Sequence, residues 1–256
     1  MHSYLLKFIA ALILLLTCIN TKAQDTLLNK ELPLKDVVVT AFNARIKWKE
    51  APAAVSILNK KVFMQFSPAS ILPAMNLVAG VRMEERSPGS YRLSVRGSLL
   101  RSPFGIRNVK VYWNNIPFSD ATGNTYLNLI DPSLIEHAEI AKGPASSMYG
   151  AGTGGVFLFN KDFPFTDKQK QSANIVLTAG SFGYNQQQFQ LINSNARVVS
   201  SLQLHRLQSD GYREQSNLNR AGLAWNTSMK TAQHLIKTGV FYTQLNYQTP
   251  GGITAA

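Results

Sequence analysis

The chain has 256 residues, a formal net charge of +12 and a single cysteine. A nucleic-acid-binding protein can carry such a charge, but its basic residues cluster in a patch or along a helix, whereas here they are scattered. The composition therefore argues against a nucleic-acid partner and favours charge at a membrane surface or in a polar lumen.

The first 23 residues are typical of a secretory signal peptide. An apolar run from Phe8 to Ile19 leads to a small-residue cleavage site that ends at Ala23, before Gln24. The run is shorter than the roughly 20 residues that a membrane-spanning helix needs. Cys18 partly imitates a lipid-acceptor cysteine, but Thr17 before it and the later cleavage site favour ordinary processing. Loss of two lysines with the leader lowers the net charge from +12 to +10, and the mature chain has no cysteine.

A strand-prone run follows the leader, and no folded domain is predicted before it. Residues 32–41 read Leu-Pro-Leu-Lys-Asp-Val-Val-Val-Thr-Ala. A strand without a sheet of its own must pair with an edge elsewhere, and strand addition is a common way for a short segment to recruit a partner. We interpret this run as a docking tether within an N-terminal tail of residues 24–41.

Residues 42–160 mix short strands, short helices and many Gly and Pro, which predicts a compact α+β domain. We expect strands at 54–58, 81–85, 91–96, 109–113 and 137–141, and helices at 60–66 and 69–77. A helical turn at 131–136 has Asp131 as its candidate N-cap and Pro132 at its first position.

From about Gln171 the pattern changes to strict alternation of apolar and polar residues in five segments of about ten residues. Alternation alone does not separate a soluble sandwich from a membrane barrel. Segment lengths near the roughly 9–11 residues of tilted membrane strands favour the barrel, as do Tyr184, Trp225 and Tyr242 near segment ends or rims. Short connections at 193–195 and 229–233 alternate with a longer polar one at 207–219, as in a barrel entered from the periplasm.

An open five-stranded sheet cannot exist in lipid, because the backbone groups at its edges would each cost several kcal/mol. We therefore interpret residues 161–256 as the first strands of a larger barrel, and the sequence as a fragment.

Four runs of the α+β domain resemble, in order and spacing, the plug domain of TonB-dependent outer-membrane receptors. They are Leu93–Gly97, Val109–Pro117, Ile135–Gly150 and Gly154–Val156. The tether resembles the TonB box of this family through Asp36, Val37, Val38, Val39, Thr40 and Ala41. The resemblance implies a barrel of about 22 strands, residence in the outer membrane of a Gram-negative bacterium, contact with its lipid, and a TonB-type energy transducer in the periplasm.

The resemblance also implies site residues. Arg96 and Lys142 stand where the family's plugs place basic residues that face acidic groups on the barrel wall. Lys142 departs from the usual Arg and cannot make its planar bidentate contact. Candidate ligand-binding residues lie in or beside Gly/Pro-rich loops; they are Arg101, Arg107, Tyr112, Asn114, Asn115, Arg213 and Tyr247.

The family takes up ferric siderophores, ferric citrate, cobalamin or glycans. About eight residues between Gln24 and Leu32 leave no room for the extra domain of signalling receptors, and the β-sandwich extension common in glycan importers is absent as well. Residues 247–254 look like a loop of iron-chelate receptors. We therefore expect transport of a ferric siderophore or ferric citrate, with a secreted or surface adhesive β-protein without transport as the alternative.

Other chemistry is poorly supported. Residues 143–150 lack the Gly-Lys-Ser/Thr ending of a phosphate-binding loop. His137 and Glu139 share one strand face, but one His and one carboxylate are too few for a metal site. No nucleophile, base and orienting residue group together, so we expect no enzyme activity, no metal and no cofactor.

Overall fold

The computed structural model describes residues 38–39, 46–66, 69–87, 90–98, 106–143, 146–150, 152 and 154–250. All of them fall in one compact unit that begins at Val38. The leader, Arg101, residues 251–256 and most of the TonB-box candidate lie outside the described residues.

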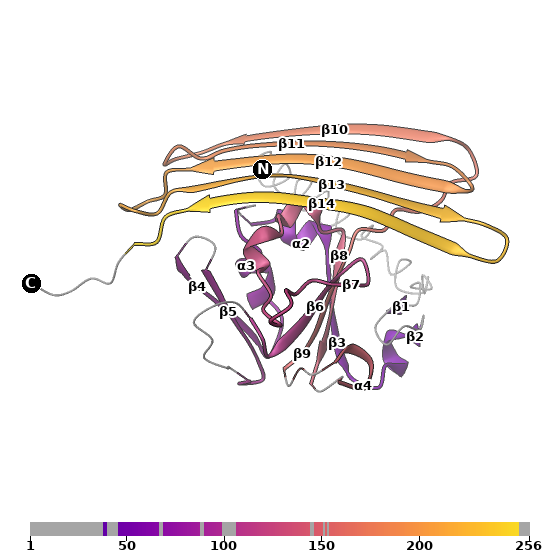
Figure 1. Ribbon diagram of the computed structural model, residues 1–256, viewed down its shortest axis with the longest axis horizontal. Coiled ribbons are helices and arrows are strands. Elements are labelled where there is room, and N and C mark those ends of the chain that lie inside the picture. Colours follow the sequence, from indigo (N-terminus) through magenta and orange to yellow (C-terminus); the bar gives the residue numbers. More distant parts are fainter. Residues whose placement is uncertain are drawn as a thin grey trace, which may run out of the picture. The chain divides into compact units, whose positions relative to one another are not determined.

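An α+β domain occupies Val38 to Asn160 (Figure 1). Its strands are β1 (Val38–Val39), β2 (Ile46–Lys47), β3 (Ala54–Asn59), β4 (Val81–Ser87), β5 (Ser90–Val95), β6 (Val109–Trp113), β7 (Ile116–Pro117), β8 (His137–Lys142) and β9 (Gly155–Asn160). Its α-helices are α2 (Lys60–Met64), α3 (Leu72–Asn76) and α4 (Ser146–Tyr149), and its 3₁₀ turns are η4 (Trp48–Glu50), η5 (Leu127–Leu129) and η6 (Pro132–Leu134).

The central sheet of this domain has the strand order β3-β8-β9-β6-β7, with β6 and β9 parallel and the other pairs antiparallel. All six residues of β9 are buried, because both faces of this inner strand are covered. Phe157 and Phe159 join the larger apolar cluster on one face, whereas Val156 and Leu158 join a smaller cluster on the other. The hairpin β4–β5 forms a separate two-stranded sheet.

A five-stranded antiparallel meander follows the α+β domain. Its strands are β10 (Lys170–Ala179), β11 (Asn185–Ser194), β12 (Val198–Ser209), β13 (Leu218–Lys230) and β14 (Leu235–Tyr247). They pair in chain order with no crossover. Short connections at 195–197 and 231–234 lie at one end, and the longer connections at 180–184 and 210–217 lie at the other.

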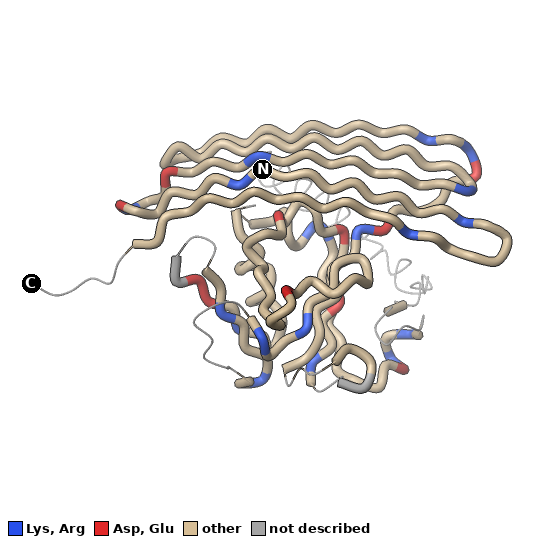
Figure 2. Tube along the Cα trace, viewed as in Figure 1, with Lys and Arg blue, Asp and Glu red and all other residues tan. Residues whose placement is uncertain are grey.

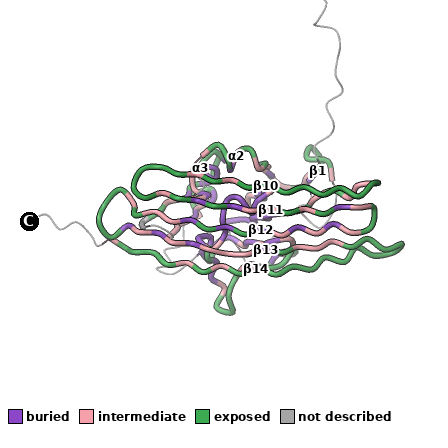
Figure 3. Tube along the Cα trace, turned by 90° about the horizontal axis from the view of Figure 1, so that it is seen from above, coloured by how far each residue is buried: buried purple, intermediate pink, exposed green. Residues whose placement is uncertain are grey.

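The two faces of the meander sheet differ in chemistry. Alternate residues of β11, β12 and β13 are buried (Figure 3), and this inner face carries Gln186, Gln188, Gln203, His205 and Arg220. The outer face is apolar and exposed, and its side chains form cross-strand rows such as Leu191, Leu202, Trp225 and Val240. The charged residues lie toward the strand ends and leave an uncharged central band (Figure 2).

The described elements match most of the sequence expectations. Strands 54–58, 81–85, 91–96, 109–113 and 137–141 are found within one or two residues, and η6 has Asp131 as its N-cap. The two helices are shorter than expected: α2 ends at Met64 and α3 begins at Leu72. The sequence did not predict the strands β2, β7 and β9, the helix α4, or the 3₁₀ turns η4 and η5. No helix in the described part of the chain combines the length and apolarity needed to cross a bilayer.

Candidate functional site: the contact between the α+β domain and the meander sheet

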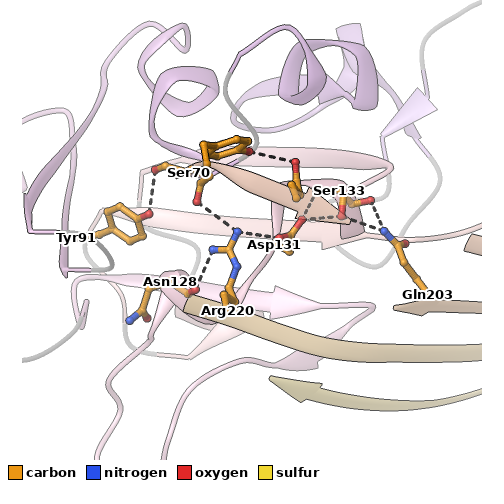
Figure 4. Close-up of polar contacts among 10 residues, drawn as sticks. Ser70, Tyr91, Asn128, Asp131, Ser133, Gln203 and Arg220 are labelled. Atoms are coloured by element: carbon orange, nitrogen blue, oxygen red, sulfur yellow. Dashed lines mark hydrogen bonds and ion pairs between the residues drawn. The ribbon is translucent and has the colours of Figure 1, made fainter. Parts of the chain in front are cut away.

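An ion pair joins the two parts of the structure in a buried setting (Figure 4). Arg220 on the inner face of β13 donates from Nη2 to Oδ2 of Asp131 at 2.8 Å, and the two side chains are 2% and 0% exposed. The other carboxylate oxygen of Asp131 accepts hydrogen bonds from the backbone N–H of Ser133 at 2.9 Å and from its hydroxyl at 2.6 Å. The N-cap of η6 is therefore also the partner of the meander sheet.

Arg220 contacts two further segments of the α+β domain. Its Nη1 donates to the carbonyl of Asn128 and its Nη2 to the carbonyl of Ala69, both at 3.3 Å. Burial raises the pKa of Asp131, but the positive charge of Arg220 and the hydrogen bonds from Ser133 outweigh burial and hold the pKa below its ordinary value. Asp131 is therefore an anion at neutral pH. We call Arg220 with its acceptors Asp131, Asn128 and Ala69 the arginine lock.

A second contact centres on Gln203 of β12. Its Nε2 donates to the carbonyl and hydroxyl oxygens of Ser133 at 3.1 and 3.0 Å, and its Oε1 accepts a hydrogen bond from Nζ of Lys161. Lys161, directly after β9, is 2% exposed. Burial lowers the pKa of Lys161 to about 7, although the negative charge of Glu136 acts in the opposite direction. The side-chain partner of this buried amino group on the meander sheet is the neutral amide of Gln203.

A third contact fixes the segment that connects the two parts. Asn114, in the left-handed turn between β6 and β7 at φ 49°, donates to Oδ1 of Asn226 on β13 at 2.8 Å. Its own Oδ1 accepts the backbone N–H of Lys161 at 2.8 Å. One residue further, Asp162 pairs with Lys237 of β14 at 2.9 Å. These residues form a linker clamp: Asn114, Lys161, Asp162, Gln203, Asn226 and Lys237.

Apolar packing accompanies the polar contacts. The rings of Trp113 and Phe118 lie 5.6 Å from that of Phe241 on β14, and the buried Ala224 of β13 belongs to the core of the α+β domain. Beside these rings, a cavity of about 620 Å³ opens between the β6–β7 hairpin and strands β13 and β14. The α+β domain therefore packs on the polar face of the meander sheet and leaves its apolar face exposed.

The predicted plug–barrel residues lie away from the arginine lock. Arg96 is exposed at φ 51°, and a side-chain carbon on Gly80 or Gly143 would lie within 4 Å of it. Lys142 donates from Nζ to the carbonyl of Ala79 at 2.9 Å. Contact of either residue with an acidic group of the barrel wall stays a prediction.

The predicted tether is described only at Val38 and Val39. They form β1, which pairs with β2 in the register Val38 to Lys47. The side chain of Val38 is 50% exposed, whereas Val39 is fully buried among residues that include Tyr149 and Leu158. Asp36, Val37, Thr40 and Ala41 lie outside the described residues.

The predicted ligand-binding residues do not gather at one place in the described structure. Asn114 belongs to the linker clamp, Asn115 follows it in the same turn, and Tyr112 donates to the carbonyl of Tyr149 at 3.1 Å. Arg213 and Tyr247 lie at the opposite end of the meander sheet, in the loop before β13 and at the end of β14. Arg101 lies outside the described residues, and ligand binding by the other six stays a prediction.

Arg107 donates from Nε to Oδ1 of Asn124 at 2.5 Å and is exposed. Nε2 of His137 and Oε1 of Glu139 lie 3.7 Å apart, and no group of three metal-binding side chains exists among the described residues.

Sequence reasoning missed Arg220 and Lys161. The sequence held a signal for Arg220. It lies on the same face of its strand as Gly222 and Ala224, the face that was expected to point into the barrel, so a cation there could have been predicted to meet the plug.

Comparison with known proteins gives a consistent result. The family model of the TonB-dependent receptor plug domain matches residues 47–156. A hemin receptor of Yersinia pestis is 26% identical over 144 residues, which are 54% of this chain and 21% of that protein. The chain thus spans about a fifth of the length of this curated relative.

Solved structures share the fold. The pyoverdine outer-membrane receptor FpvA of Pseudomonas aeruginosa PAO1 superposes with a TM-score of 0.65 at 14% identity, over 82% of this chain and 31% of that one. The alcaligin receptor FauA of Bordetella pertussis gives 0.58 at 17% identity, over 80% and 34% of the two chains. The copper transporter OprC gives 0.62 at 16% identity, over 78% and 31%.

Proposed function

We propose that the chain is part of a TonB-dependent receptor of the Gram-negative outer membrane, and that this receptor carries out energised uptake of an iron chelate. In this proposal residues 42–160, which include the residues 47–156 matched by the plug-domain model, form the plug, and β10 to β14 form the first part of the barrel wall. The ligand binds at the external side, and a periplasmic TonB-type partner pulls the tether so that the plug rearranges.

The observation that carries this proposal is the way in which the plug meets the wall. An apolar outer face suits lipid, and a polar inner face holds the plug through the arginine lock and the linker clamp. Hydrogen bonds and ion pairs can be exchanged for water when the plug moves, whereas a large apolar interface would resist movement. An adhesive protein without transport has no need of such a contact.

Iron chelates are the preferred ligand class. Ferric siderophores and ferric citrate are anionic or rich in acceptor oxygens, and cationic residues of the external loops such as Arg213 can bind them. The relative that is described as a hemin receptor adds haem to the compounds to be tested.

The test is growth under iron limitation of a strain that lacks the gene. Ferric siderophores, ferric citrate and hemin are supplied one at a time, and the full-length gene is returned on a plasmid as the control. We expect growth to fail on at least one of these sources and to recover with the plasmid. Normal growth of the deletion strain on every source would contradict iron uptake and leave cobalamin or a glycan to be tested.

A further inference from the structure

Asn76 joins the β4–β5 hairpin and helix α3 into one hydrogen-bonded body. Its Nδ2 donates to the carbonyl of Met83 at 3.0 Å, and its Oδ1 accepts the N–H of Met83 at 2.7 Å. The hairpin lies toward the end of the wall at which β14 finishes (Figure 1). This is the end with the long loops, where an external ligand arrives.

Tyr91 links this body to the segment that faces the arginine lock. Its hydroxyl donates to Oγ of Ser70 at 2.9 Å, and the same Oγ accepts the N–H of Leu72 at 3.1 Å (Figure 4). The preceding residue, Ala69, presents its carbonyl to Arg220. Burial and then the charge of Glu85 raise the pKa of Tyr91 to about 12, so the hydroxyl stays protonated and can donate at neutral pH.

We propose that Tyr91 is a positioning residue for transport: through Ser70 it holds the Ala69 carbonyl on Arg220, so that displacement of the β4–β5 hairpin by a bound ligand loosens the arginine lock. This inference rests on the proposed function for the arrival of a ligand. The coupling itself rests on the contacts of Tyr91, Ser70 and Arg220 alone.

The lock is loosened rather than broken in this scheme. Arg220 keeps Asp131 and the carbonyl of Asn128 when the Ala69 carbonyl withdraws. The guanidinium therefore remains paired in its buried position, which avoids the large cost of an isolated buried charge. A partial loss of this kind can be reversed when the ligand leaves the hairpin.

The first experiment compares Tyr91→Phe with the wild-type full-length receptor in outer membranes. Hydrogen exchange is measured for the peptide that covers residues 128–135. Phe keeps the ring and removes only the donor, so we expect exchange to become faster by about two- to tenfold, as for loss of one hydrogen bond. The matched control is Tyr126→Phe, whose hydroxyl bonds to the exposed Asp120 and should leave this exchange unchanged.

A double-mutant cycle separates coupling from general softening of the plug. Arg220→Lys retains a charge for Asp131 but lacks the fork that also reaches Ala69. If Tyr91 acts through this contact, Tyr91→Phe will add little to the effect of Arg220→Lys. Unchanged exchange in Tyr91→Phe, or additive effects of the two substitutions, would overturn the proposal.

The ligand arm uses hemin and ferric citrate as probes. With a probe that binds, we expect faster exchange at residues 128–135 in the wild type, and a smaller ligand-dependent change in Tyr91→Phe at equal probe affinity. An identical ligand-dependent change in both proteins would count against the coupling. Failure of both probes to bind would instead count against the proposed ligand class, while the exchange and cycle experiments still decide the role of Tyr91.

Discussion

At the scale of single residues, the plug and the wall depend on one buried pair of opposite charge. Arg220 donates to three plug residues in two segments, Ala69 in one and Asn128 and Asp131 in the other. Asp131 both caps η6 and accepts the guanidinium. Removal of one partner of a buried pair costs about 3–5 kcal/mol, since the other charge stays desolvated and unpaired. The arginine lock is therefore the contact at which a single substitution should have the largest effect on docking.

The Asp131 carboxylate predicts how docking depends on pH. Its pKa in the docked plug lies below the ordinary value of 3.8, so its contribution is complete above that value and is lost as the pH falls through the lowered pKa. We expect docking to be stable from pH 5 to 8 by this contribution and to weaken below about pH 4. Fluorescence of Trp113, which packs against Phe241, reports docking when the other tryptophans of the full-length receptor, Trp48 and Trp225 among them, are replaced by Phe.

Two substitutions test this assignment. Asp131→Asn should weaken docking at neutral pH by about 3–5 kcal/mol and remove the acid-dependent loss. Asp120→Asn is the control, because Asp120 is exposed and its hydrogen bonds with Thr122 and Asn124 stay within its own loop. The same acid-dependent loss in Asp131→Asn as in the wild type would show that another group is responsible.

At the scale of elements, strand β13 has a glycine, Gly222, at the position where the His205 ring of β12 packs against it. Gly222 pairs with His205 of β12 and Thr243 of β14. A Cβ on Gly222 would lie 2.6 Å from both the His205 ring and the backbone carbonyl of Tyr242, so the ring occupies the space of the missing side chain. The backbone carbonyl cannot move away without a shift of β14.

Gly222→Ala should therefore destabilise the wall by about 1–3 kcal/mol, the usual cost of overpacking. The measurement is the temperature at which the folded, heat-modifiable band of the full-length receptor converts to the unfolded band on a gel. Gly180→Ala serves as the control, because a Cβ there would meet only the Tyr184 side chain at 3.6 Å, an ordinary van der Waals distance. Equal conversion temperatures for Gly222→Ala and wild type would contradict this packing.

The elements also show what a sequence can and cannot predict. Period-two alternation located the five wall strands and the correct inner face, because that signal is local. Strand β9 was missed, because a run of buried residues after several glycines has no alternation. The pair of Asp131 and Arg220 joins residues 89 positions apart, and no local pattern specifies such a partner.

At the scale of the whole molecule, the wall and the tether act on different parts of the plug. The wall holds the larger apolar cluster, in which Ala224 lies, and it holds the connecting segment through the linker clamp. Val39 of the tether belongs to the smaller cluster on the other face of the plug sheet, with Val156 and Leu158. In the proposed mechanism, a pull on the tether therefore acts first on the smaller cluster, while the lock and the clamp keep the rest of the plug on the wall.

Replacement of Val38 by Pro tests the tether without disturbing the core. The Val38 side chain is half exposed, whereas Val39 is buried, so a change at Val38 leaves the smaller cluster intact. Pro fixes φ and removes a backbone donor, which impairs pairing of Val38 both with β2 and with the strand edge of a periplasmic partner. We expect uptake of the iron source identified by the growth test to fall at least tenfold in Val38→Pro, while binding of that compound at the cell surface persists. Val38→Ala, which keeps the backbone donor, should transport at the wild-type rate, and wild-type uptake by Val38→Pro would show that strand pairing at this position is not how the receptor is energised.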